Sequence, residues 1–411
     1  MMREFYPGTQ RYSGDRALSR ALAEEAITQD DHDLIGQYIR ERQATRHISD
    51  HRRNKIAGTL AGWRRFIPAP FSAATLPEIH QGIAALKVGQ SHKGRPFKQN
   101  TIHDHIRILK PFLLWLIENG HSSLPTKKVK EITAPPVDYQ TTEPDEILTV
   151  EEIRTLLAAC LNPRDRAMIS LLYESGCRIG ELARICWRDI VFDEYGCKLY
   201  LHDGKSKKRR YSRLTMAAEY IAAWKADYRP GHPDPGTLVF QTFEGRPLDY
   251  IQARRIISRA HRRAGIEKKI TPHLFRHSRI THMIGQNYQE SIIKKSLWGN
   301  INTAMFAAYV NLAEQDIDNE FLHRAGITQK QETTPALQPT TCPNCHRTNA
   351  PTADYCTRCA EPLSDAARDR EEKKRSTLIE DLERDPLYIA LESRYQQFME
   401  EARAEIARLK S

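Results

Sequence analysis

The sequence has little of what marks a membrane or secreted protein, and it has a deficit of acidic residues. Its 411 residues contain no apolar run of about 18 residues, so no membrane-spanning helix is predicted. The first residues, MMREFYPGTQRYSGDR, hold no apolar segment of the kind that a signal peptide needs, and we expect an intracellular protein. Asp and Glu number 52 against 62 Lys and Arg, a formal net charge of +10. This excess suggests a polyanionic partner, either nucleic acid or an acidic membrane surface.

The positive charge is concentrated in the front part of the chain. Residues 31–134 hold 17 Lys and Arg against 8 Asp and Glu, a net charge of 17 − 8 = +9. Residues 364–411 hold 10 against 12, a net charge of −2. The front part therefore carries the basic surface, and the tail serves another task.

The eight cysteines fall into two groups. Four are scattered through apolar or mixed sequence and are expected to be reduced core residues: Cys160, Cys177, Cys186 and Cys197. The others form two Cys-x-x-Cys pairs in CPNCHRTNAPTADYCTRC, namely Cys342, Cys345, Cys356 and Cys359. Four thiolates at this spacing predict one tetrahedral structural Zn²⁺ site, in a ribbon too small to fold without its metal. Two disulfides are the alternative, which a reducing cytosol disfavours.

Periodicity divides the chain into helical and mixed parts. Residues 31–134 repeat apolar side chains at spacings of three and four, as in KQNTIHDHIRILKPFLLWLIENG, where Gly120 is a plausible helix stop. Later stretches alternate like strands: DIVFD, CKLYLH and RYSRLT. We predict a mainly α fold with a small antiparallel β-sheet. The predicted parts are an arm (1–30), a helical domain (31–134), a linker (135–147), a mixed domain (148–328), a linker (329–340), a zinc ribbon (341–363) and a helical tail (364–411).

Four stretches of the mixed domain combine residues suited to phosphate chemistry. They are YESGCRIGELARI with Arg178, HDGKSKKRRYSRL with six basic residues among 205–213, TPHLFRHSRITHM with His273, Arg276 and His277, and SLWGNINTAMFAAYV with Tyr309. Each has a plain structural reading by itself: a helix-capping arginine, a solvated hairpin, a histidine at a helix start, and a packing tyrosine. Four such stretches in this order make the structural reading of all of them improbable.

Together these stretches resemble the tyrosine recombinase, or phage integrase, family, over roughly residues 30–325. The match is Xer-like, and the cysteine cluster with DIDNEFLHRAGI resembles archaeal, methanogen-type members. The resemblance implies a catalytic domain preceded by a SAM-like helical core-binding domain. It also implies site-specific DNA recombination through a 3′-phosphotyrosyl intermediate, without ATP, a nucleotide cofactor or a catalytic metal. The implied partners are double-stranded DNA and other copies of the chain, as a tetramer on paired sites, with no membrane and in the cytoplasm with the nucleoid.

The resemblance also assigns roles to residues. Tyr309 is the nucleophile, and Arg178 and Arg276 clamp the charge of the phosphate in the transition state. Lys205 protonates the leaving 5′-oxygen, with Lys207 and Lys208 as less favoured alternatives, and His273 assists proton transfer. Supporting positions are Glu181, which orients Arg178, and His277. Lys207, Lys208, Arg209 and Arg210 are expected to contact DNA phosphates.

One position departs from the family pattern. The residue nine before the nucleophile is usually His or Trp, and here it is Asn300, with Trp298 two residues earlier. An amide and an indole N–H can each donate to a phosphate, so both stay candidates. Two other functions also stay open, a type IB topoisomerase-like relaxing enzyme and a catalytically inactive DNA-binding regulator.

The tail carries an apolar stripe at spacings of three and four on a highly charged helix. Its members are Leu387, Leu391, Tyr395, Phe398, Ala402, Ile406 and Leu409. Self-association and folding back onto the chain are the two ways of covering it. The role of the ribbon, on DNA or on another subunit, is likewise open.

Overall fold

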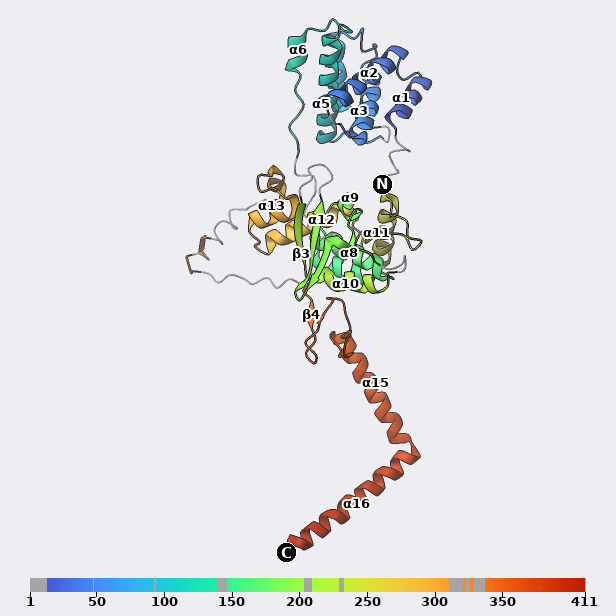
Figure 1. Ribbon diagram of the computed structural model, residues 1–411, viewed down its shortest axis with the longest axis vertical. Coiled ribbons are helices and arrows are strands. Elements are labelled where there is room, and N and C mark those ends of the chain that lie inside the picture. Colours follow the sequence, from blue (N-terminus) through green and yellow to red (C-terminus); the bar gives the residue numbers. More distant parts are fainter. Residues whose placement is uncertain are drawn as a thin grey trace. The chain divides into compact units, whose positions relative to one another are not determined.

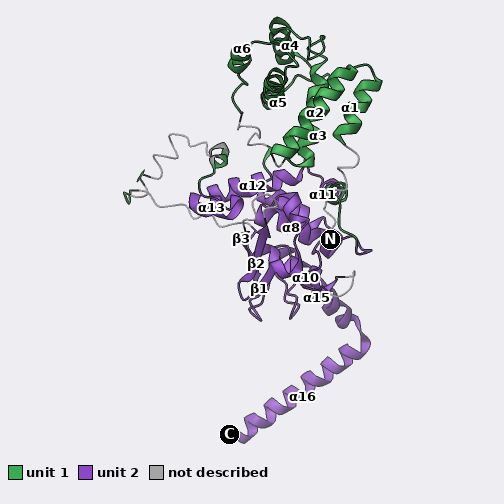
Figure 2. Cartoon of the chain, turned by 45° about the horizontal axis from the view of Figure 1, so that its top comes forward, with its two compact units in different colours: residues 1–147, 246–255, 302–329 green, residues 148–245, 256–301, 330–411 purple. Residues whose placement is uncertain are grey.

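The computed structural model describes residues 13–46, 48–91, 94–138, 146–202, 209–228, 233–309, 321–322, 325–327 and 337–410. The chain forms two compact units (Figure 2). One contains residues 1–147, 246–255 and 302–329, and the other contains residues 148–245, 256–301 and 330–411. Helices dominate and only two small antiparallel sheets are described, which confirms the predicted fold class (Figure 1). None of the described helices is long and apolar enough to cross a membrane.

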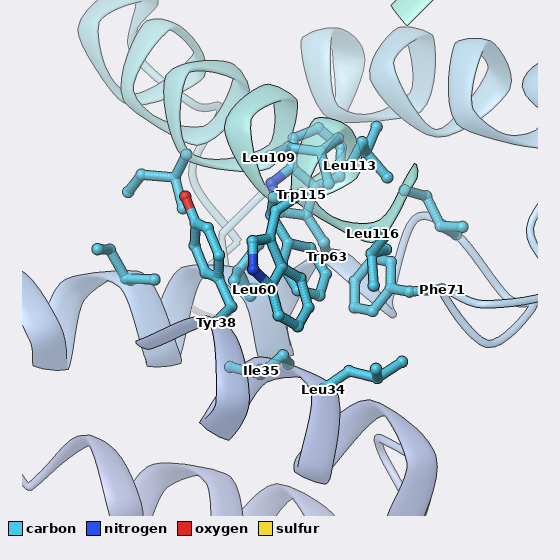
Figure 3. Close-up of a cluster of buried hydrophobic side chains, with 14 of the residues drawn as sticks. Leu34, Ile35, Tyr38, Leu60, Trp63, Phe71, Leu109, Leu113, Trp115 and Leu116 are labelled. Atoms are coloured by element: carbon cyan, nitrogen blue, oxygen red, sulfur yellow. The ribbon is translucent and has the colours of Figure 1, made fainter. Parts of the chain in front are cut away.

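The first unit is built mainly from six helices. They are α1 (Gly14–Ala23), α2 (Gln29–Thr45), α3 (Asp50–Trp63), α4 (Leu76–Val88), α5 (Gln99–Glu118) and α6 (Thr126–Glu131). The apolar stripe predicted on α5 is buried, with Leu113 and Leu116 fully enclosed beside Trp63 and Phe71 (Figure 3). The helix stops as predicted, because Gly120 takes a left-handed φ of 72°.

The described part of the predicted arm, residues 13–30, differs from the prediction. Residues Gly14–Ala23 form α1, which packs on α3: Leu18 is buried, and the backbone N–H of Gly14 donates to Oδ1 of Asn54 at 2.7 Å. The helix is short and rich in charge, so only a few apolar side chains reveal its period. The stabilising contact is made by a residue 40 positions away, which local periodicity does not report.

The second unit holds the predicted hairpin strands. Strands β1 (Ile190–Asp193), β2 (Gly196–His202) and β3 (Arg209–Leu214) form an antiparallel sheet in chain order, with Tyr200 opposite Tyr211. The helices of this unit are α7 (Val150–Ala158), α8 (Pro163–Ser175), α9 (Ile179–Leu182), η3 (Trp187–Asp189), α10 (Met216–Ala226), α12 (Pro272–Gly285) and α13 (Glu290–Trp298). Helix α11 (Tyr250–Ala264) is divided between the units, and η4 (Ala304–Tyr309) belongs to the first.

Two hydrogen-bonded helix caps fix this unit. Thr149 and Glu152 make the predicted capping box at the start of α7. The carboxylate of Glu174, from α8, accepts the backbone N–H groups of Thr215, Met216 and Ala217, so it caps α10 directly after β3. The four scattered cysteines are buried and unbridged, as predicted.

The C-terminal part contains a two-stranded ribbon and two long helices. Strands β4 (Thr340–Thr341) and β5 (Thr348–Asn349) pair antiparallel, and α15 (Asp365–Arg384) is followed by α16 (Pro386–Lys410). The predicted stripe on α16 is exposed, with Leu387 at 82% and Leu391 at 68% of full exposure. Self-association and folding back onto the chain both stay predictions for how this stripe is covered.

Candidate active site and cysteine cluster

Arg178 begins the short helix α9 and is held by Glu181. Gly176 ends α8 with a φ of 54°, and a Cβ there would lie 2.6 Å from Cδ2 of Leu297, so the turn before Arg178 requires glycine. One carboxylate oxygen of Glu181 accepts the backbone N–H of Arg178 at 2.7 Å, and the other accepts Nη1 at 3.3 Å. The Arg178 side chain is half exposed and Glu181 is buried. The expected pairing of the two residues is therefore present, with the guanidinium reaching the surface.

Arg210 is the second partner of Glu181. Its Nη2 donates to Oε2 of Glu181 at 2.6 Å, and both side chains are buried. Burial acts to raise the pKa of Glu181, but the charge and hydrogen bond of Arg210, followed by Arg178, outweigh it and hold the pKa below its usual range. The guanidinium is 4% exposed, and each of its three nitrogens donates to a group of the protein. The inward position on β3 thus places this side chain in the protein, and the predicted phosphate contact of Arg210 stays a prediction.

Arg276 lies buried on α12 between the ends of two helices. Its Nη1 donates to the carbonyl of Gly176 at 2.7 Å and its Nη2 to the carbonyl of Leu297 at 2.9 Å. Its Cζ lies 4.9 Å from the ring centroid of Trp298. The side chain thus joins the end of α8, next to Arg178, to the end of α13.

His273 and His277 lie one turn apart on α12. Their ring centroids are 4.4 Å apart and the rings are perpendicular. His273 is an exposed residue, but desolvation of its ring by neighbouring groups, followed by the charges of Arg276 and Arg178, lowers its pKa. Burial, then His273 and Arg276, lowers the pKa of His277 to about 4. Both rings are therefore neutral near pH 7, and a neutral imidazole can accept or donate a proton.

Trp298 and Asn300 stand on either side of a left-handed glycine. Trp298 is the last residue of α13, Gly299 takes a φ of 68°, and Asn300 is exposed. The Trp298 ring lies against Arg276, which favours a packing role for it. Which of the two side chains meets a phosphate stays a prediction.

The remaining predicted residues do not lie with the two arginines among the described residues of the second unit, apart from Arg209 on β3. Tyr309 is the last residue of η4, is half-buried, and belongs to the first unit, whereas both arginines belong to the second. Lys205, Lys207 and Lys208 lie outside the described residues. Arg209 is exposed on β3, with its Cζ 4.2 Å from the ring centroid of Tyr200.

The four clustered cysteines form one compact sulfur site. All four sulfurs lie within 4.8 Å of one another, with Cys342 3.5 Å from Cys359 and Cys345 3.4 Å from Cys356. Sulfurs bound to one zinc at about 2.3 Å in a tetrahedron lie about 3.8 Å apart, so the cluster could hold such a metal ion.

The backbone around the cluster repeats itself. After each Cys-x-x-Cys pair comes a residue with left-handed φ, His346 at 55° and Ala360 at 58°. The N–H of each donates to the carbonyl of the first cysteine of its pair, at 3.0 Å and 2.9 Å. The N–H of Cys345 points at the sulfur of Cys342, and that of Arg358 at the sulfur of Cys356. Such N–H groups stabilise thiolates, so the two turns fit a metal better than a pair of disulfides.

The cluster is attached to helices of the second unit. The hydroxyls of Tyr220 on α10 and Thr352 share a 2.6 Å hydrogen bond, and Nη1 of Arg154 on α7 approaches the carbonyl of Pro351 at 3.5 Å. Tyr220 is buried. The ribbon is therefore a docked part of this unit.

Residues 146–316 match the Phage integrase family, so this part of the chain is similar to the tyrosine recombinases. Tyrosine recombinase XerC of Xanthomonas campestris pv. campestris (strain B100) is 27% identical over 249 residues, which are 59% of this chain and 72% of that protein.

Solved structures show the same fold. A lambda integrase dimer bound to a COC′ core site matches with a TM-score of 0.53 and 18% identity, over 69% of this chain and 96% of that one. The XerH site-specific recombinase bound to difH matches with a TM-score of 0.51 and 16% identity, over 74% and 94%.

Proposed function

We propose that the chain is a site-specific DNA recombinase that cuts and rejoins DNA strands through a 3′-phosphotyrosyl intermediate on Tyr309. The observation that carries the proposal is the convergence of Arg178, His273 and Arg276, with Glu181, in a domain that is similar to the tyrosine recombinases. Two guanidinium groups and a neutral imidazole are what a phosphoryl transfer without a metal needs.

The proposed step breaks one phosphodiester and forms another. The phenolic oxygen of Tyr309 attacks phosphorus, the bond to the 5′-oxygen breaks, and the 3′-phosphate stays on the tyrosine. The phenol passes its proton to a neutral base, for which His273 is the candidate, and Lys205 gives a proton to the 5′-oxygen. Attack by a 5′-hydroxyl reverses the step. Because the bond is conserved in the intermediate, no ATP is consumed.

A basic cleft in the first unit supports binding to a phosphate backbone. The cleft has a volume of about 650 Å³ and is lined by Arg42, Arg46, Arg52, Arg107 and Lys110, among others. The buried Nε of Arg42 has no hydrogen-bond acceptor among the described residues. We also propose that exposed Arg209, together with Lys207 and Lys208, contacts DNA phosphates. Binding through phosphates should weaken steeply with salt.

The remaining parts of the proposal concern metal, assembly and location. The cysteine cluster holds one structural Zn²⁺, which keeps the ribbon docked on α7 and α10. Recombination between two duplexes engages four copies of the chain on paired sites, in the cytoplasm with the nucleoid.

The decisive experiment uses a nicked suicide duplex that carries a site selected by binding to the full chain. Wild type should form a covalent protein–DNA adduct, and Tyr309→Phe should form none while binding DNA normally. Tyr288→Phe is the matched control, because Tyr288 is an exposed tyrosine between α12 and α13. If the wild type forms no adduct, strand cutting is refuted, and a catalytically inactive DNA-binding regulator is the function that remains. Relaxation of supercoiled plasmid by a monomer, without strand exchange, favours the topoisomerase-like function.

A further inference from the structure

Arg210 makes contacts that reach beyond a salt bridge. It is the second residue of β3, opposite Leu201 of β2, and its side chain points into the unit. Its Nη2 and Nε donate to the two carboxylate oxygens of Glu181 at 2.6 Å and 3.4 Å. Its Nη1 donates to the carbonyl of Ser296, in the last turn of α13, at 2.5 Å. One guanidinium therefore connects the hairpin, α9 and α13.

The end of α13 that Arg210 contacts is also bound by Arg276. The next carbonyl, that of Leu297, accepts Nη2 of Arg276. Two arginines from different elements thus cap adjacent carbonyls at the negative end of α13. A Cβ on Gly299 would lie 3.5 Å from Cβ of Arg210, so the turn that leads to Asn300 runs directly past this residue.

The Glu181 contact determines how Arg178 is held. Glu181 accepts both the backbone N–H and Nη1 of Arg178, and it is itself buried. The charged side chains that face its carboxylate are Arg210 and Arg178, and the neighbouring Cys177 is uncharged because burial raises the pKa of its thiol to about 12. Arg178 is half exposed, so Arg210 is the only fully buried counter-charge among the described groups that face Glu181.

We propose that Arg210 is a positioning residue for strand cleavage, which acts through Glu181 on Arg178 and through Ser296 on the end of α13. This inference rests on the proposed function. A merely structural Arg210 would stabilise the hairpin, and its loss would slow cleavage equally at every pH. A positioning Arg210 also keeps Glu181 ionised, so its loss should make cleavage sensitive to acid.

The experiment compares Arg210→Met, Arg210→Lys and wild type in single-turnover adduct formation on the suicide duplex, from pH 6 to pH 8.5. For Arg210→Met we expect the rate at pH 8 to fall about tenfold or more, as for a misplaced reacting group. Without the counter-charge of Arg210, burial should raise the pKa of Glu181 in this variant, and below that pKa the rate should fall by about a further tenfold per pH unit. Arg210→Lys retains the charge and should restore the wild-type pH profile even if its rate is lower.

The matched control is Arg213→Met. Arg213 lies on the same strand, and its Nη1 donates to both carboxylate oxygens of Asp193, but that pair is exposed. Its rate and pH profile should match the wild type. A parallel loss of rate for Arg210→Met at every pH, or no loss, overturns the inference while the wild-type adduct upholds the proposed function. If the wild type forms no adduct, the proposed function fails, and the inference about cleavage fails with it.

Discussion

The two arginines proposed to clamp one phosphate should differ sharply in what they contribute to stability. Arg276 is 2% exposed and donates two charge-assisted hydrogen bonds, to the carbonyls of Gly176 and Leu297. Lysine keeps the charge but is a single point donor without the planar fork, so Arg276→Lys loses about one such bond and leaves a buried carbonyl unpaired. We expect the free energy of unfolding to fall by about 2–3 kcal/mol.

The same substitution at Arg178 is the comparison. Its side chain is half exposed, so Arg178→Lys should change the free energy of unfolding by less than about 0.5 kcal/mol. Both variants should lose adduct formation. Differential scanning calorimetry should place the transition of the second unit about 4–12 °C lower for Arg276→Lys and nearly unchanged for Arg178→Lys. An Arg276→Lys protein as stable as the wild type would refute the bridging role of Arg276.

Three further outcomes follow from the structure. Chelation of metal, or Cys356→Ser, should undock the ribbon and lower the melting temperature of the second unit, with one equivalent of zinc released on chelation. The free energy of unfolding should decrease as pH falls from about 6.5 toward about 4, because the unfolded chain protonates His277 in this window and the folded chain does not. Urea titrations at several pH values measure this dependence, and His277→Asn should make the free energy of unfolding less dependent on pH. Arg107→Gln should weaken DNA binding and reduce the salt slope by about one, whereas Lys128→Gln, which alters an exposed pair outside the cleft, should do neither.

Local patterns were sufficient for the features that depend on neighbouring residues. Alternation predicted the hairpin, and the three-residue spacing of Arg178 and Glu181 places both at the start of one helix, where a carboxylate meets the backbone N–H. The cysteine spacing predicted a four-sulfur cluster for the same reason, since each pair closes its own turn.

Contacts between distant segments could not be predicted in this way. Arg210 was counted with its basic neighbours as a phosphate contact, but its position on β3 is an inward one that alternates with exposed Arg209 and Tyr211. An arginine at an inward strand position needs a buried carboxylate. The alternation of inward and outward residues along β3 therefore already indicated that Arg210 pairs with one. Its partner is 29 residues away, so only the fold identifies it as Glu181.

The most direct test of strand cutting is to locate the covalent bond itself. The adduct formed on the suicide duplex is digested with nuclease and protease, and the modified peptide is sequenced by mass spectrometry. We expect a single nucleotide 3′-phosphate on the phenolic oxygen of Tyr309, with the released strand ending in a 5′-hydroxyl. A phosphate on Tyr288, on a serine, or on no residue of the chain contradicts it.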